Sequence, residues 1–155
     1  MTSLPYRSAV GIMLLNAERK VFVGQRLDTT LDAWQMPQGG IEPGEDPLAA
    51  GLRELEEETG IAPHLVELIA RGSRTFDYDL PEALVGKVWG GRYRGQRQTW
   101  FLARFLGGDD DVDLATAEPE FRAWRWADPH ELPAMIVPFK RSLYEALIAE
   151  FGPHL

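Results

Sequence analysis

The chain has 155 residues, of which 45% are hydrophobic, and its 24 acidic and 16 basic residues give a net charge of −8. This length predicts a single domain over residues 1–155, which can bury about two-thirds of its surface. The negative charge argues against duplex DNA as a partner, because such binding depends on many cationic contacts to phosphates. The chain contains no cysteine, which excludes disulfides, thiolate metal sites and thiol nucleophiles and suits a reducing cytoplasm.

The histidines and the apolar runs limit the kind of metal site and the cellular location that we expect. His64, His130 and His154 are too scattered to form a cluster, so any metal should be held mostly by oxygen atoms, which favours magnesium, manganese or calcium over zinc. There is no apolar run of about 18 residues and no signal peptide pattern at the N-terminus. We therefore expect a soluble, cytoplasmic protein that does not bind membranes. Its oligomeric state does not follow from the sequence.

The first predicted elements are strands. Apolar residues at Ala9–Leu15 and Val21–Val23, separated by polar residues 16–20, predict a hairpin. Trp34–Met36 is a short extended segment before Pro37, and the glycines and prolines of residues 39–44 predict a loop.

A helix over residues 47–59 has the clearest signals at its ends. Asp46 is a good N-cap, Pro47 suits the first helical position, and Gly60 suits the position after the last turn. We therefore expect this helix to begin and end at these residues.

Three carboxylates, Glu54, Glu57 and Glu58, share one face of this helix, and Leu48, Leu52 and Leu55 form a separate apolar stripe. Like charges three or four residues apart destabilise an isolated helix by a few tenths of a kcal/mol per pair. A divalent cation bound by carboxylate oxygens would compensate this repulsion.

The remaining chain predicts strands followed by a closing helix. Predicted strands cover residues 65–70, 75–80, 98–106 and 124–126, and the glycines of residues 85–94 predict a surface loop. Apolar side chains at positions 139, 143, 147 and 151 predict a helix over residues 139–151. This order predicts an α+β fold in which helices pack on the faces of a mixed sheet.

A spaced pattern surrounds the first helix and resembles the Nudix box, G-x5-E-x7-R-E-U-x-E-E-x-G-U, where U is apolar. All specified positions are matched, by Gly39, Glu45, Arg53, Glu54, Leu55, Glu57, Glu58, Gly60 and Ile61. An isolated acidic triplet is usually a solvated helix face, but a complete match favours a functional site. The resemblance to Nudix hydrolases implies an α/β/α sandwich that uses Mg²⁺ or Mn²⁺ to cleave a nucleoside diphosphate linked to another group.

The resemblance also implies roles for individual residues. Glu54, Glu57 and Glu58 would bind the metal and activate water, with Glu54 as the expected general base. Arg53 would orient a carboxylate ligand as part of the catalytic group, supported by Glu45, while Gly39 and Gly60 are structural positions of the motif. Outside the box, Glu120 resembles a further acidic metal ligand, for which Glu118 is the substitute, and a surface role remains open for Glu120.

Residues 34–40, Trp-Gln-Met-Pro-Gln-Gly-Gly, resemble the signature of the Nudix branch that contains bacterial RNA pyrophosphohydrolases and dinucleoside polyphosphate hydrolases. The resemblance covers nearly the whole chain. It implies removal of pyrophosphate from the 5′-triphosphate end of RNA, with hydrolysis of a dinucleoside polyphosphate such as diadenosine tetraphosphate as the alternative. A nucleotide-sensing module without catalysis is a weaker alternative, because such modules usually lose glutamates that are present here.

Several residues are candidates for binding such a substrate. Arg7, Arg26 and Arg97 are candidate phosphate contacts, although a solvated role is open for each. Gln38 is expected at the substrate, and its backbone carbonyl or that of Gly39 is expected to complete the metal coordination. Phe139 could stack on a base while Lys140 meets a phosphate, but Phe139 could equally belong to the core.

Overall fold

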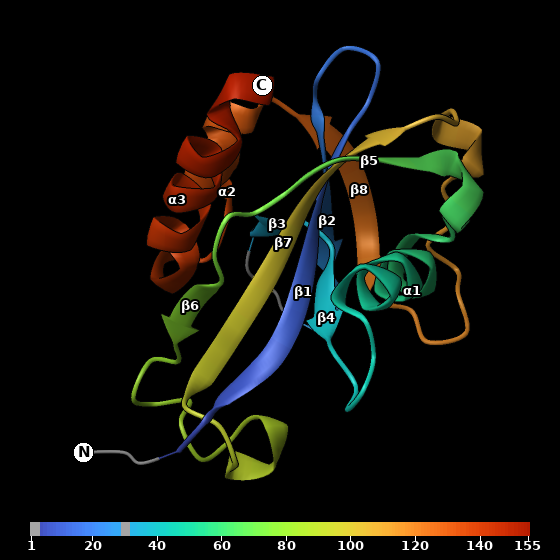
Figure 1. The fold of residues 1–155 in the computed structure, drawn as a ribbon. Coiled ribbons are helices and arrows are strands. Elements are labelled where there is room, and N and C mark those ends of the chain that lie inside the picture. Colours follow the sequence, from blue (N-terminus) through green and yellow to red (C-terminus); the bar gives the residue numbers. More distant parts are fainter. Residues whose placement is uncertain (1–3, 29–31) are drawn as a thin grey trace.

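Two parallel strands form the centre of the fold. In the computed structural model, which describes residues 4–28 and 32–155, β1 (Tyr6–Leu15) pairs with β7 (Gly95–Phe105) along its whole length (Figure 1). The remaining strands are β2 (Val21–Arg26), β3 (Trp34–Gln35), β4 (Gln38–Gly40), β5 (Val66–Arg71), β6 (Phe76–Asp79) and β8 (Phe121–Ala127). The main order is β3-β2-β1-β7-β5, and β4, β6 and β8 pair with β1, β7 and β2. Because these other pairings are antiparallel, the sheet is mixed, as predicted.

Helices cover both faces of the sheet. Helix α1 (Pro47–Thr59) lies on one face, and α2 (Leu132–Met135) and α3 (Arg141–Phe151) lie on the other (Figure 1). The core is divided in the same way, because successive side chains of a strand point to opposite faces. Along β1, Ile12 packs in the cluster that contains Leu55 of α1, and Met13 packs in the cluster that contains Leu147 of α3. This confirms the α/β/α sandwich.

The ends of α1 are those predicted. The Asp46 carboxylate accepts a hydrogen bond from the Ala49 backbone N–H at 3.1 Å, and Gly60 has the left-handed φ of 75°. A side chain at Gly60 would also contact the backbone of Asp113. These contacts fix where the helix begins and ends, and with it the position of its acidic face.

Two predictions for other segments are wrong. Gly39 and Gly40, predicted to lie in a loop, belong to β4, because the backbone of residues 38–40 pairs with residues 9–11 of β1. The last helix begins at Arg141 instead of Phe139, because Pro138–Lys140 form a separate 3-10 turn. Leu143, Leu147 and Phe151 are buried as predicted, whereas 38% of Phe139 is exposed. Among the described residues, no helix is both long enough and apolar enough to cross a membrane.

One buried hydrogen bond joins α3 to the chain segment that leads into β4. The Tyr144 hydroxyl accepts a hydrogen bond from the Met36 backbone N–H at 2.8 Å. We expect Tyr144→Phe to lower the free energy of unfolding by about 1–3 kcal/mol, because it leaves this buried N–H unsatisfied. Urea unfolding measures the change. Tyr93→Phe is the control, since no partner of the Tyr93 hydroxyl is found in the described ranges, and an equal loss in both variants would contradict the prediction.

Candidate active site

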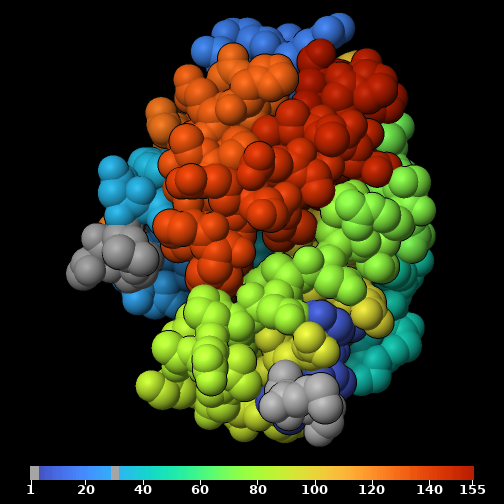
Figure 2. Space-filling model, turned by 90° about the vertical axis from the view of Figure 1, so that its left-hand side faces the viewer, coloured from blue at the N-terminus to red at the C-terminus, as the bar shows by residue number. Residues whose placement is uncertain are grey.

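A cleft of about 750 Å³ opens beside β4. Figure 2 shows the surface hollowed between the yellow-green segment near residue 85 and the orange-red segments near the C-terminus. Acidic side chains line one part of the cleft, namely Glu54, Glu57, Glu58, Glu118 and Glu120. Cationic, amide and apolar side chains line the rest, among them Arg7, Arg26, Lys140, Gln38, Gln96, Tyr78, Leu84, Val88, Trp89 and Phe139. The cleft therefore joins a dense group of carboxylates to a surface suited to phosphates and bases.

The three carboxylates of α1 differ in burial. Glu58 is only 4% exposed, and the side chains of Glu54 and Glu57 are 19% and 57% exposed. Glu54 lies directly against the backbone of β4, where a Cβ added at Gly39 would overlap its carboxylate. Gly39 is therefore required because the carboxylate of Glu54 occupies the space that any side chain would take.

Arg53 connects the carboxylates to β4 and to the loop before α1. Its guanidinium donates to Glu45 at 2.8 and 2.9 Å, to Glu54 at 2.9 Å and to Glu57 at 3.3 Å. It also donates to the Gly40 carbonyl at 3.1 Å. Hydrogen bonds from Arg53, together with the Glu42 backbone, lower the pKa of Glu45 to about 2. The Arg53 guanidinium thus binds two of the candidate metal ligands, Glu54 and Glu57, and is itself bound by Glu45.

Among the three carboxylates of α1, Glu58 is the one whose negative charge its surroundings disfavour most. Burial, and then the charges of Glu54 and Glu120, raise its pKa well above the usual value for a glutamate. Its Oε2 atom is buried and has no hydrogen-bond partner in the described part of the chain. Burial followed by the charge of Glu57 likewise raises the pKa of Glu54, against the opposing effect of Arg53. These carboxylates supply hard oxygen donors whose repulsion the nearby arginines offset only in part, so they fit a divalent metal ion.

Within residues 4–28 and 32–155, no three acidic or histidine side chains already surround a common point as metal ligands do. Arg53 pairs with Glu54 and Glu57, whereas Glu120 is directed at Arg26.

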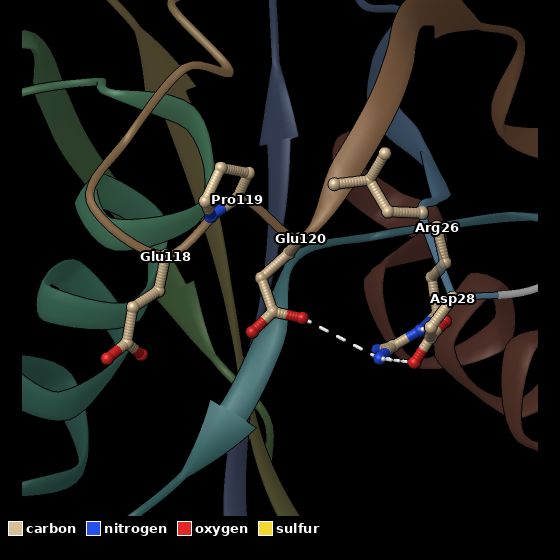
Figure 3. Close-up of a pocket in the computed structure, with 6 residues that line it drawn as sticks. Arg26, Asp28, Glu118, Pro119 and Glu120 are labelled. Atoms are coloured by element: carbon tan, nitrogen blue, oxygen red, sulfur yellow. Dashed lines mark hydrogen bonds and ion pairs between the residues drawn. The ribbon is translucent and has the colours of Figure 1, made fainter.

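Two further acids come from the loop before β8 (Figure 3). The Glu120 carboxylate is directed at Arg26, at 3.6 Å, and Arg26 also donates to Asp28 at 2.7 Å. Glu118 extends from the same loop in a separate direction (Figure 3). Both acids line a space of about 250 Å³ with the three glutamates of α1. The structure therefore brings Glu120 and its substitute to the same place.

The opposite part of the cleft carries cations beside aromatic rings. The Arg7 guanidinium lies 5.5 Å from the centre of the Trp89 ring and over Gly40, where a Cβ would collide with it. The Lys140 ammonium lies 5.0 Å from the centre of the Tyr78 ring, and Phe139 lies 6.0 Å from the same ring. Burial, and then the charge of Arg26, lower the pKa of Lys140 to about 8.

Among the candidate substrate-binding residues, Arg97 is the one that the structure does not bring to the cleft. It is exposed on β7 and paired with Asp77 at 3.0 Å, because its side chain points away from the face of its neighbours Gln96 and Gln98. Residues 85–94 were expected to be a surface loop, but Val88 and Trp89 within this segment line the cleft and pack on the core. Gln96 was also missed, although a polar residue at a buried strand position was the available signal.

Comparison with known proteins agrees with this geometry. The model of the NUDIX domain matches residues 5–147. The chain belongs to the Nudix family. It is 61% identical to the RNA pyrophosphohydrolase of Sphingopyxis alaskensis over 97% of this chain and 95% of that protein. It is 56% identical to the RNA pyrophosphohydrolase of Cereibacter sphaeroides over 99% of this chain and 94% of that protein.

A solved structure shows the same fold at lower identity. The Ap4A hydrolase of C. elegans superposes with a TM-score of 0.67, at 22% identity, over 95% of this chain and 98% of that one. As a Nudix hydrolase, the chain acts on phosphoanhydride bonds, and the family generally uses divalent metal ions. The buried, repelling carboxylates of α1 are the part of this chain that fits such an ion.

We expect Glu58→Gln to raise the free energy of unfolding in metal-free buffer by about 1–2 kcal/mol, because it removes a buried carboxylate for which no ion pair is found in the described ranges. Mg²⁺ should raise the melting temperature of the wild type and have a much smaller effect on the variant. Thermal unfolding with and without Mg²⁺ measures both effects. Glu56→Gln is the control on the exposed face of α1, and a larger response to Mg²⁺ in Glu58→Gln than in the wild type would contradict the assignment.

Proposed function

We propose that this protein removes pyrophosphate from the 5′-triphosphate end of RNA and leaves a 5′-monophosphate. The observation that carries the proposal is the single cleft in which the carboxylates of α1 face a cationic and aromatic surface. The extensive identity to proteins named RNA pyrophosphohydrolase supports the choice of RNA. We propose Mg²⁺ or Mn²⁺ as the metal, because the available donors are carboxylate oxygens.

The acidic residues of the cleft and Arg53 would have separate roles in the reaction. Glu54, Glu57, Glu58 and Glu120 would hold the metal, which when bound would neutralise phosphate charge and acidify a water molecule. Glu54 would accept the proton of the attacking water. Arg53 would orient the Glu54 carboxylate, because its guanidinium donates to Glu54 at 2.9 Å while it also donates to Glu45 at 2.8 Å.

Binding would use the other part of the cleft. Arg7 and Arg26 are the candidate contacts to the phosphates, and Gln38 also lines the cleft as a candidate contact to the substrate. The partly exposed Phe139 ring offers a face to a base, and Lys140 offers a cation beside it. A location in the cytoplasm is the expected one for such a substrate and stays a prediction.

A dinucleoside polyphosphate is the second candidate substrate. Phe139 and Tyr78 form one aromatic surface of the cleft, and Trp89, which packs against Tyr93 outside the lining, forms another. The cleft therefore offers a place for each of two bases. The shared fold with an Ap4A hydrolase is compatible with this candidate. A sensing module without catalysis is less well supported, because every glutamate of the motif is present.

Parallel turnover measurements test the proposal. With Mg²⁺, we expect faster release of pyrophosphate from 5′-triphosphorylated RNA than cleavage of diadenosine tetraphosphate, and no turnover in excess chelator. Glu57→Gln should lower kcat more than tenfold, a loss above about 1.4 kcal/mol, because it removes a metal ligand, whereas Glu56→Gln should not. Preference for the dinucleotide would reverse the order of the candidates, and turnover of neither would favour a sensing module.

Phe139 distinguishes base recognition from core packing. We expect Phe139→Ala to raise KM for RNA about tenfold, within the 1–3 kcal/mol of a lost stacking contact. Its melting temperature should change little, because 38% of the side chain is already exposed. Leu106→Ala, which truncates a side chain that is 54% exposed elsewhere, is the control. A large loss of stability with unchanged KM for the folded fraction would assign Phe139 to the core.

A further inference from the structure

A chain of side-chain hydrogen bonds runs through the core to the cleft. Gln96, Gln98 and Trp100 lie on one face of β7, because they alternate along the strand, and each is only 1% exposed. The Trp100 indole N–H donates to Gln98 Oε1 at 2.8 Å. Gln98 Nε2 donates to Gln96 Oε1 at 2.7 Å and to Gln38 Oε1 at 3.3 Å.

The direction of this chain follows from the chemistry of its buried end. An indole N–H can only donate, so it requires an oxygen, and the Gln98 amide must turn its oxygen toward Trp100. The nitrogen of Gln98 then faces the two other amides, and it also can only donate. Both Gln96 and Gln38 must therefore present oxygen to Gln98, whichever way their amides could otherwise turn.

The end of this hydrogen-bond series that faces the cleft is a hydrogen-bond donor. Gln96 lines the cleft, and its Oε1 is occupied by Gln98, so its Nε2 is the atom left for another partner. The hydrogen bond found for the Gln96 side chain in the described ranges is the one at Oε1, and none is found at Nε2. Gln96 is also paired in register with Arg7 on the parallel strand β1, so the amide and the guanidinium enter the cleft side by side.

We propose that Gln96 donates a hydrogen bond to a phosphate oxygen of the substrate, and that Trp100 is the positioning residue that fixes this donor through Gln98. The proposal rests on the proposed function only in requiring a substrate with a chain of phosphates. Phosphate oxygens only accept hydrogen bonds, so the orientation of the Gln96 amide decides whether it attracts or repels the phosphate. In the reversed orientation the carbonyl oxygen of Gln96 would face the phosphate and repel it.

Substitution of Gln96 gives the first test. Gln96→Glu keeps the shape and can still accept from Gln98, but it faces the phosphates with an oxygen instead of an N–H. We expect KM to rise at least tenfold with kcat changed less than threefold, and tripolyphosphate to bind at least tenfold more weakly in calorimetry. Gln96→Ala removes the amide without adding the negative charge of a glutamate, and it should also raise KM.

Trp100→Phe tests the positioning role, because it removes the indole N–H and keeps an aromatic ring. The Gln98 amide is then free to turn, and we expect KM to rise threefold to tenfold. In the Gln96→Ala background the same substitution should change KM less than twofold, because its effect passes through Gln96. Trp126→Phe is the matched control, since it removes an indole N–H that donates to Asp109 at 2.8 Å and lies outside the cleft lining.

The outcomes separate this inference from the proposed function. A wild-type KM in Gln96→Glu overturns the phosphate contact, and equal effects of Trp100→Phe with and without Gln96 overturn the positioning role. If the wild type cleaves only diadenosine tetraphosphate, the RNA assignment fails, but the same variants still test the contact to phosphate. If it cleaves neither substrate, the calorimetry with tripolyphosphate decides, and unchanged binding by Gln96→Glu overturns the inference.

Discussion

The site depends on the partial burial of an acidic helix face against β4. Carboxylates at positions 54, 57 and 58 repel one another, and the burial of Glu58 adds a further cost to its charge. The fold offsets part of this cost through Arg53, which binds Glu54 and Glu57 while Glu45 binds it in turn. Arg26 offsets a further part, since it lies 3.6 Å from Glu120 and opposes the rise in the pKa of Glu58. The pKa of Glu58 is nevertheless raised well above its usual value, and the repulsion that remains is what makes the site suited to a cation.

The close packing at β4 follows from the same constraint. Gly39 leaves room for the Glu54 carboxylate, and Gly40 leaves room for the Arg7 guanidinium. These neighbours in sequence thus place a carboxylate and a phosphate-binding candidate next to the same short strand. Pairing of β4 with β1 fixes this strand to the sheet, and the hydrogen bond from Met36 to Tyr144 ties the segment before it to α3.

The central strands supply the rest of the cleft. Within the core, β1 and β7 direct apolar residues to both helical layers, as expected for strands covered on both faces. Toward the cleft the same strands carry Arg7 and Gln96 in register. The change from apolar to polar side chains along paired strands is therefore what converts the core of the sandwich into a binding surface.

The sequence by itself determined α1 and the acidic group that it carries. The caps at Asp46 and Gly60 and the spacing of the glutamates are local properties, set by the helical period and by which residues tolerate helix ends. The complete motif was enough to indicate the family, and the alternation of strands and helices was enough to indicate the α+β class.

Only the tertiary structure decided which distant residues share the cleft. Trp89 and Gln96 enter it, whereas Arg97 points away, because strand alternation and the path of residues 81–94 separate neighbours in sequence. Strand β4 likewise forms because β1 pairs with it, which no propensity of a Gln-Gly-Gly segment indicates. The orientation of the glutamine amides depends on an indole from the buried end of β7, so it too exists only once the chain is folded.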